Sequence, residues 1–436
     1  MKQGIVGSIL LFFLGLMVQA AGAVDVQMNG DVSVTGSVTA TSFSGSGSGL
    51  TNLDPTKITS GTASINISGN AATATTATTA SSVAPLAVTN AGLANDAVTP
   101  AKIAFYGKVA IVATSGGDFS NPAIAMSNYA TWCGTPSTTN PCLLKVMPGV
   151  YDVGASSVVM QPFIDIEGSG EKTTKITGAV DGTSLPPTAG IVQSASNAEL
   201  RFLTVENTFT GVSTAILNSG ASPSILHVTS TALAGTFSYG VTDNFSSAAM
   251  TNVTATASGT LSGYGVYNSS SSPTMTNVTA TASAGSGSSY GVYNVNNSSS
   301  PTMVNVTVTA SGATTANYGV FNSNASSPIM TTVTATASGG TGNNYGLYND
   351  STSLTMANVT VSASGGSASF GVFNTNGTVK ISHSIIRGAT NTIFNASGVT
   401  LVGSSQLDGG AVSNAGILTC AGLYDENFVF FGNNCP

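Results

Sequence analysis

Apolar and polar residues follow a repeated pattern along the C-terminal half of the chain. One copy reads Met250-Thr-Asn-Val253-Thr-Ala-Thr-Ala, continues through a Gly/Ser segment and ends on Tyr264-Gly-Val-Tyr267-Asn. Neighbouring copies begin 25 to 28 residues apart, at Leu200, Ile225, Met275, Met303, Met330, Met356 and Ile381. A nearly constant period in this range is typical of stacked structural units, none of which can bury its apolar face alone.

Each copy is expected to contain a bent strand. Val253 and Ala255 alternate with threonines, which places the Val and Ala side chains in the core and the Thr side chains outside. Met250 has the wrong parity to lie on the same straight strand as Val253. We therefore predict a bend at Asn252, because Asn adopts the left-handed conformation more readily than most residues.

The bend position forms a column of polar residues down the repeats. Stacked Asn side chains in such a column can hydrogen-bond from one coil to the next, so we expect an inward-facing asparagine ladder. This role also accounts for both histidines and for the Asn-x-Thr sequences, which we interpret as ladder positions rather than as catalytic groups or glycosylation sites. The column contains His227, Asn252, Asn277, Asn305, Thr332, Asn358 and His383.

The scarcity of charge excludes several functions. Charged residues make up 6% of the chain, against roughly a quarter in ordinary globular domains. Between Glu206 and Lys380 the only charged residues are Asp243 and Asp350. No nucleic-acid partner is expected, because such proteins carry basic patches, and nothing in the sequence calls for a cofactor.

A short apolar segment at the N-terminus predicts export. Residues 1–23 contain Lys2, an apolar run over 5–18 and an Ala21-Gly-Ala23 cleavage site, which together indicate a cleaved signal peptide. No later segment reaches 18 consecutive apolar residues, so no membrane span is predicted. We expect a secreted or cell-surface protein of bacterial origin.

Residues 24–103 are low in complexity and hold too few large apolar side chains to form a core. The segment Phe43-Ser-Gly-Ser-Gly-Ser-Gly-Leu50 resembles the stalks of phage tail fibres and of tail-fibre-like bacterial surface proteins. That resemblance implies a stalk through which the chain would form a homotrimer. A flexible linker is the alternative interpretation.

Four cysteines agree with an oxidising compartment. Cys133 and Cys142 are nine residues apart, and Cys420 and Cys435 are fifteen apart near the C-terminus. Two local disulfides are the simplest of three possible pairings, and four free thiols are the remaining alternative. We expect each bridge to close a cap at one end of the stack.

The segment before the repeats carries a second fold signal. Leu143-Leu-Lys-Val-Met-Pro-Gly-Val-Tyr-Asp152 reads as a strand running into a Pro-Gly turn, and Ile164-Asp-Ile-Glu-Gly-Ser-Gly170 leads to Thr174-Lys-Ile-Thr-Gly178. With the repeats, these motifs resemble pectin-lyase-like right-handed parallel β-helix proteins such as pectinesterases. The resemblance implies an all-β, single-stranded parallel β-helix (solenoid) over 104–404, capped by 104–142 and 405–436.

Catalysis is not expected on the repeat coils. The resembled enzymes use acidic residues on adjacent coils, and general acid–base chemistry needs two carboxylates near one bond. Asp243 and Asp350 are about four coils apart, and those coils hold no Lys or Arg. The acidic residues that do cluster are interpreted as a charged cap on the first coils: Asp152, Asp165, Glu167, Glu171, Glu199 and Glu206.

Two surface columns are the remaining candidates for binding. The aromatic column could stack sugars if it were exposed, although we favour a core position, and it contains Tyr267, Tyr293, Phe321, Tyr348 and Phe373. The paired threonine columns resemble the ice-binding face of β-helical antifreeze proteins and contain Thr254, Thr256, Thr279, Thr281, Thr307, Thr309, Thr334 and Thr336.

We therefore predict a non-catalytic structural or adhesion protein, exported to the cell surface or beyond, whose partner is a glycan or another surface component. A polysaccharide-active enzyme of the resembled fold is one alternative. An ice-binding protein is the other.

Overall fold

The computed structural model describes residues 106–296 and 299–435, together with residues 29, 31, 33–39 and 42. The predicted signal peptide and most of the predicted stalk lie outside the described residues. The chain divides at residue 84 into two units, and every helix and strand below belongs to the second.

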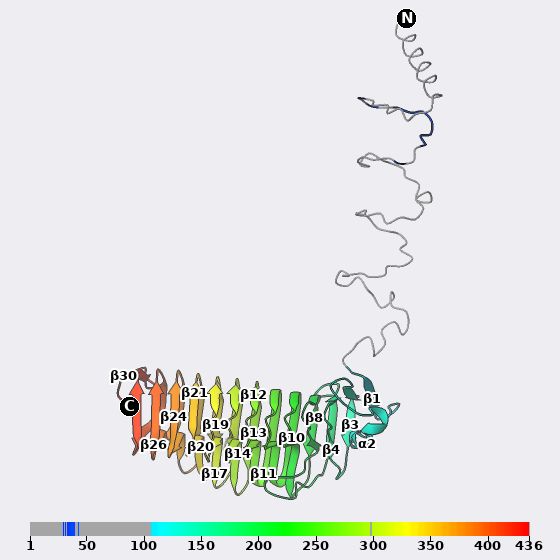
Figure 1. Ribbon diagram of the computed structural model, residues 1–436. Helices are drawn as coiled ribbons and strands as arrows, with labels where there is room; N and C mark the ends of the chain where they lie inside the picture. The colour runs from blue at the N-terminus through cyan, green and yellow to red at the C-terminus, as the bar shows by residue number, and fades with distance from the viewer. Residues whose placement is uncertain are drawn as a thin grey trace. The chain divides into compact units, whose positions relative to one another are not determined.

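Strands of successive coils pair in parallel, one coil upon the next (Figure 1). Between the named strands of the described region, every pairing is parallel except that of the last two, β29 and β30. The all-β parallel β-helix expected from the sequence is confirmed.

Each coil contributes strand segments to three faces. Five long strands bend through more than one face: β8 (Glu199–Asn207), β10 (Ser224–Asn244), β11 (Ala249–Ser269), β25 (Ile385–Asn395) and β27 (Gln406–Asn414). The methionine face adds β1 (Lys108–Val112), β2 (Cys142–Val146), β5 (Ile164–Glu167), β12 (Thr274–Thr276), β15 (Thr302–Val304), β18 (Ile329–Thr331), β21 (Ser353–Ala357), β24 (Gly377–Ser382), β26 (Gly398–Gly403) and β28 (Ile417–Ala421).

The other two faces are built in the same way. The threonine face adds β3 (Gly149–Asp152), β6 (Thr174–Gly178), β13 (Thr279–Ala284), β16 (Thr307–Ser311), β19 (Thr334–Ser338), β22 (Thr360–Ser364) and β29 (Leu423–Tyr424). The aromatic face adds β4 (Val158–Val159), β7 (Val192–Gln193), β9 (Val212–Ser219), β14 (Ser288–Val295), β17 (Ala316–Asn322), β20 (Asn343–Asp350) and β23 (Ser369–Thr375). The final strand is β30 (Phe430–Gly432).

The core is a stack of identical or similar side chains. The residues that begin each repeat point inward from the methionine face and are at most 3% exposed: Leu200, Ile225, Met250, Met275, Met303, Met330, Met356 and Ile381. Val253 and Ala255 enter the core from the threonine face, and Val266 enters it from the aromatic face. Alternation along each strand therefore sorts the sequence into core and surface as predicted.

The bend between the methionine and threonine faces occurs at the column that contains Asn252. All seven residues predicted for this column have φ between 49° and 55°. Their side chains point outward, however, and Asn277, Asn305 and Asn358 are exposed. The inward direction expected from the sequence is wrong, because the left-handed residue turns the chain with its side chain on the convex side of the bend.

A different column supplies the buried ladder. It lies at the end of the aromatic face, where the chain turns back toward the methionine face, and each member is at most 1% exposed: Asn218, Asp243, Asn268, Asn294, Asn322, Asn349, Asn374 and Asn395. Side-chain bonds join most neighbours, including Asn268 to Asn294 at 2.8 Å and Asn374 to Asn395 at 3.0 Å.

The N-terminal end of the stack is covered by α2 (Pro122–Ser127) and α3 (Tyr129–Trp132). Asn121 caps α2 by accepting hydrogen bonds from the next turn, Met126 enters the core, and the Trp132 indole donates to the Ala125 carbonyl at 2.9 Å. The Cys133–Cys142 disulfide ties this cap to β2.

At the other end, parallel pairing continues through β28, where Val402 pairs with Cys420. The domain boundary expected at residue 404 thus falls inside the stack. The Cys420–Cys435 disulfide then closes the β29–β30 segment over the last coil. Leu423 is fully buried there, whereas Phe428 is 77% exposed.

Candidate functional site

The outer surface of the threonine face is a regular array of hydroxyl groups. Its first column stacks Thr229, Thr254, Thr279, Thr307, Thr334 and Thr360 in direct register. Its second column stacks Thr231, Thr256, Thr281, Thr309, Thr336 and Ser362. Strand geometry sets the repeat at about 4.8 Å between coils and about 6.6 Å along a strand.

Polar columns flank these threonines on both sides. The outward Asn column lies at the bend before them, and a serine column follows them with Ser258, Ser283, Ser311, Ser338 and Ser364. The only charged residues between Glu206 and Lys380, Asp243 and Asp350, lie on strands of the aromatic face. The coils thus present a flat neutral surface of amides and hydroxyls.

Hydrogen bonds order the first part of the outward Asn column. The Asn305 amide donates to Asn277 Oδ1 at 2.7 Å, and the Asn277 amide donates to Asn252 Oδ1 at 3.0 Å. Asn252 Nδ2 lies 3.1 Å from His227 Nε2. The series stops at Thr332, which has no amide group with which to continue it.

His227 and a nearby carboxylate form the charged end of this surface. The imidazole stacks on Phe202, with ring centroids 5.4 Å apart, and His227 Nδ1 lies 3.7 Å from Glu171 Oε1. The second oxygen of Glu171 accepts a hydrogen bond from the Thr229 hydroxyl at 2.8 Å. His383, which the sequence placed in the same column, lies far along the stack and is exposed.

The aromatic face carries two columns of rings rather than one. The predicted column of Tyr267, Tyr293, Phe321, Tyr348 and Phe373 continues to Phe394. Beside it runs a column that sequence reasoning did not single out: Tyr239, Tyr264, Tyr290, Tyr318, Tyr345 and Phe370. The first aromatic of each Tyr-Gly-Val-Tyr motif was the signal for the second column.

Tyr267 is buried, as the favoured core position requires, but its equivalents Tyr293, Phe321, Tyr348 and Phe373 are only half-buried. Most of these rings are half-buried on the outer side of the strands, where the two columns pack edge to face, as Tyr318 does on Phe321 with centroids 5.1 Å apart. Within a column the rings stack face to face. Ring faces are thus covered by neighbouring rings, and the columns offer edges and hydroxyls to a ligand. Burial raises the pKa of the Tyr318 phenol, so this hydroxyl stays neutral.

Ionic side chains gather on the outer side of the methionine face at the first coils. Arg201 on β8 bonds to Glu167 on β5 at 2.7 Å and also contacts Glu199. Lys145 on β2 bonds to the same Glu167 at 2.7 Å. The Tyr106 hydroxyl donates to Asp165 Oδ2 at 2.6 Å and accepts from Arg201 at 2.8 Å.

Most carboxylate oxygens in this cluster have partners. Burial and the hydrogen bond to Asp165 together raise the pKa of the Tyr106 phenol to about 12, although the hydrogen bond from Arg201 opposes them. Burial alone would raise the pKa of the Glu167 carboxyl, but hydrogen bonds from Lys145 and Arg201 outweigh it and lower that pKa. Of the six acids expected to form a charged cap, Asp165, Glu167 and Glu199 belong to an ion-pair network that joins β2, β5 and β8. The other three lie outside it: Glu206 pairs with Lys175, Glu171 contacts Thr229 and His227, and Asp152 accepts from the Gly154 backbone.

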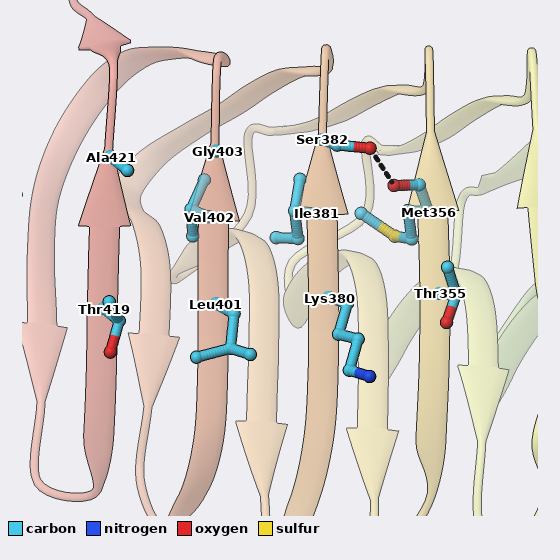
Figure 2. Close-up of a pocket in the computed structure, with 10 residues that line it drawn as sticks. All are labelled: Thr355, Met356, Lys380, Ile381, Ser382, Leu401, Val402, Gly403, Thr419 and Ala421. Atoms are coloured by element: carbon cyan, nitrogen blue, oxygen red, sulfur yellow. Dashed lines mark hydrogen bonds between the residues drawn. The ribbon is translucent and has the colours of Figure 1, made fainter.

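The methionine face also has a shallow hollow near its C-terminal end, with a volume of about 330 Å³. Figure 2 shows Lys380 on β24 between Thr355 on β21 and Leu401 on β26, which are its register partners. The lining is mostly apolar, and none of its ten residues is acidic. A polar hollow of about 570 Å³ lies along the turns after the aromatic face, lined by Ser270, Asn296, Asn324, Ala325 and Ser351.

Two further features bear on cofactor and membrane interactions. Among the described residues, no group of three or more His, Cys, Asp and Glu side chains is arranged to hold a metal ion. Within the same part of the chain, no helix has the length and hydrophobicity needed to cross a membrane.

Comparison with solved structures finds other proteins of the same β-helix fold. The chain matches the Azotobacter vinelandii mannuronan C-5 epimerase AlgE4 A-module at 15% identity and a TM-score of 0.42, over 66% of this chain and 83% of that one. It matches carrot pectin methylesterase at 13% identity and a TM-score of 0.40, over 59% and 82%. Pectate lyase Pel9A matches at 13% identity and a TM-score of 0.39, over 71% and 78%. No protein-family model and no curated protein matches the sequence.

These likenesses concern the pectin-lyase-like β-helix fold alone, which is the fold the sequence motifs implied. They contradict the expectation that the protein is not an enzyme, because enzymes are prominent among the solved structures that share its architecture. The expectation was drawn mainly from the charge-poor repeat coils. The structure instead brings Asp165, Glu167 and Glu199 together with Arg201 on the first coils.

Proposed function

We propose that this β-helix is an extracellular binding protein whose threonine face contacts a neutral, repetitive carbohydrate. The observation that carries the proposal is the array of amide and hydroxyl columns that stays in register from coil to coil. Export through the N-terminal segment and trimer formation through the stalk belong to the same proposal.

The chemistry of the face suits hydroxyl-rich polymers. Each of the four coils that begin at Met250, Met275, Met303 and Met330 offers an outward residue at the bend, two threonines and one serine, and none of these groups is charged. A single hydroxyl contact is weak, but a polymer that repeats its own groups can engage many coils at once, and linked contacts multiply affinity. The relation of several structural neighbours to polysaccharides, as their names state, supports this class of ligand.

Substituting valine for threonine tests the face directly. Thr256→Val, Thr281→Val and Thr309→Val remove three hydroxyls from one column while keeping the branched shape that strands favour. We expect the triple variant to lose most of its binding to the polysaccharides that wild type retains on a glycan array. The matched control is Thr274→Val, Thr302→Val and Thr355→Val, which removes outward hydroxyls from the methionine face. Equal loss in both triple variants, or no loss in the first, would count against the proposal.

Ice is a second candidate ligand, favoured by the two-dimensional order of the threonine array. Ice binding by this face should survive the substitution of threonine by valine but not by a larger residue. A protruding side chain would separate the flat face from the flat surface of the crystal. Thr309→Tyr should therefore abolish any thermal hysteresis shown by wild type. Wild type without thermal hysteresis or inhibition of ice recrystallisation would exclude this candidate and leave the carbohydrate proposal standing.

A further inference from the structure

The buried ladder contains one residue that differs from all the others. Asp243 occupies a column otherwise made of asparagines, and it is fully buried between Asn218 on β9 and Asn268 on β11. The Asn218 amide donates to Asp243 Oδ1 at 2.9 Å, and the Ser246 hydroxyl donates to the same oxygen at 3.1 Å. These neighbours are not titratable, and the described region places no charged group against this carboxyl.

Three polar atoms of this ladder have no partner within the described region. They are Asp243 Oδ2, Asn268 Oδ1 and Asn322 Nδ2, all buried. The first two belong to register partners on adjacent coils. Two acceptor oxygens, and no donor, are therefore left at the position where these two coils would be expected to form a ladder hydrogen bond. A buried polar atom without a partner is costly, which makes three in one column a feature that needs a physical explanation.

These unpartnered atoms lie at the two ends of a block of three side-chain amides, all of which donate in the same direction along the stack. Asn268 donates to Asn294 at 2.8 Å, and Asn294 donates to Asn322 at 2.7 Å. In the described hydrogen bonds, none of these three amides also donates to a backbone carbonyl. The next amides are anchored in that way: Asn349 donates to the Thr352 carbonyl at 3.2 Å and Asn395 to the Ile417 carbonyl at 3.1 Å.

We propose that the Asn268–Asn294–Asn322 block has two hydrogen-bonding directions and that Asp243 selects between them by holding or releasing one proton. With the proton on Asp243 Oδ2, the carboxyl donates to Asn268 Oδ1 and the block keeps the direction described above. Without the proton, the three amides turn over, and Asn268 Nδ2 donates to the carboxylate. Asn294 then donates to Asn268 and Asn322 donates to Asn294. All three orphaned atoms gain partners, while Asn322 Oδ1 gives up the hydrogen bond that it accepts from Asn294. An amide has nearly the same shape after its O and N exchange, so the reversal needs no movement of the coils.

The sign of the resulting pH dependence follows from burial. Burial raises the pKa of Asp243 from 3.8 to about 6, and the hydrogen bonds from Asn218 and Ser246 oppose this only in part. The folded protein therefore keeps a proton that the unfolded chain has lost between those two pH values. The stabilising contribution is fully present below pH 3.8 and is lost as the pH rises through about 6.

Asp243→Asn is the decisive variant, because asparagine already fills the rest of the column and can complete the ladder at any pH. We expect the Tm of Asp243→Asn relative to wild type to rise between pH 4 and about 7 and to stay level above that. Asp350→Asn is the matched control, since this aspartate on β20 lies outside the ladder, and its Tm difference should not change over the same range.

Side-chain amide resonances of asparagine separate the reversal from simple protonation. In wild type, the NH₂ signals of Asn268, Asn294 and Asn322 should titrate with one common midpoint, while those of Asn349 and Asn374 stay fixed. In Asp243→Asn none of the five should titrate. Movement of Asn268 alone, or a Tm difference independent of pH, would overturn the proposal.

Discussion

At the scale of single residues, close packing between coils decides which side chains the repeat can hold. The glycine of each Tyr-Gly-Val-Tyr motif lies against the next coil: a Cβ placed on Gly265 would come 2.6 Å from the Gly291 carbonyl oxygen and 3.0 Å from the Thr281 nitrogen. Both obstacles are backbone atoms, so they cannot move aside without shifting a coil. Gly240 meets the Gly265 oxygen in the same way. Glycine is required here by contact rather than by backbone conformation.

Gly265→Ala should therefore destabilise the protein by about 2 to 3 kcal/mol, the upper part of the usual range for overpacked cores. Gly403→Ala is the control, because the nearest atom to its added Cβ would be the Ala421 oxygen at 4.0 Å. Chemical denaturation of both variants checks the prediction. Equal stability of the two variants would show that adjacent coils separate more easily than the close contacts suggest.

At the scale of elements, the sequence predicts strands well where residues of one type recur on the same side of a strand. Met250 and Val253 have opposite parity, which revealed the bend, and the period of 25 to 28 residues revealed the stack. The direction of the Asn252 side chain was not predictable, because period and parity do not fix which side of a bend is convex. The predicted column does carry hydrogen bonds from coil to coil between His227 and Asn305, but on the outer surface. The buried ladder was not predicted, although Asn268 and its equivalents end every motif.

The first coils were the least predictable elements, because their ion pairs join distant segments. Tyr106 and Arg201 are 95 residues apart in the chain and 2.8 Å apart in space. No period links them, since the coils before Leu200 lack the repeat. The second aromatic column, by contrast, could have been predicted from the repeat, because Tyr264 and Tyr267 both belong to the motif. The sequence did not show how the two rings pack on the outer side of the strands.

Removing the guanidinium from the first coils should leave several carboxylates without their partner. Arg201 is 13% exposed and faces Asp165, Glu167 and Glu199, whose side chains are 22% to 26% exposed. We expect Arg201→Met to cost about 2 to 3 kcal/mol at neutral pH, somewhat less than for fully buried pairs. Arg387→Met is the matched control, because its pair with Asp408 is half exposed at the arginine and should be worth less than about 1 kcal/mol.

The pH dependence of the Arg201→Met defect has a definite sign. The pKa of Glu167 is lowered in the folded protein, so its ion pairs stabilise the fold above the ordinary pKa of 4.5 and are lost as the pH falls below it. The difference in unfolding free energy between wild type and Arg201→Met should therefore shrink on acidification. A difference that stays constant from pH 7 to about pH 3 would indicate lost packing rather than lost charge pairing.

At the scale of the whole molecule, each coil contacts only the coils before and after it, and stability should be close to a sum over coils. The columns make neighbouring coils interchangeable: Met275, Met303 and Met330 occupy one position, and Asn294, Asn322 and Asn349 another. A coil can then be deleted without changing the types of residue that the two neighbouring coils contact, provided that the deletion preserves the register of the columns.

Deleting residues 303–329 removes one complete coil and joins Thr302 directly to Met330. The new contacts would pair Met275 with Met330 and Thr281 with Thr336, which repeats the pairings already present between neighbouring coils. We expect this variant to keep its β-sheet circular dichroism and cooperative unfolding, with a Tm only a few degrees lower. Deleting residues 303–315 instead would join the methionine face to Ala316 of the aromatic face and put every later column out of register. That shorter deletion should abolish cooperative unfolding, and if it were tolerated as well as the longer one, column register would not be what holds the coils together.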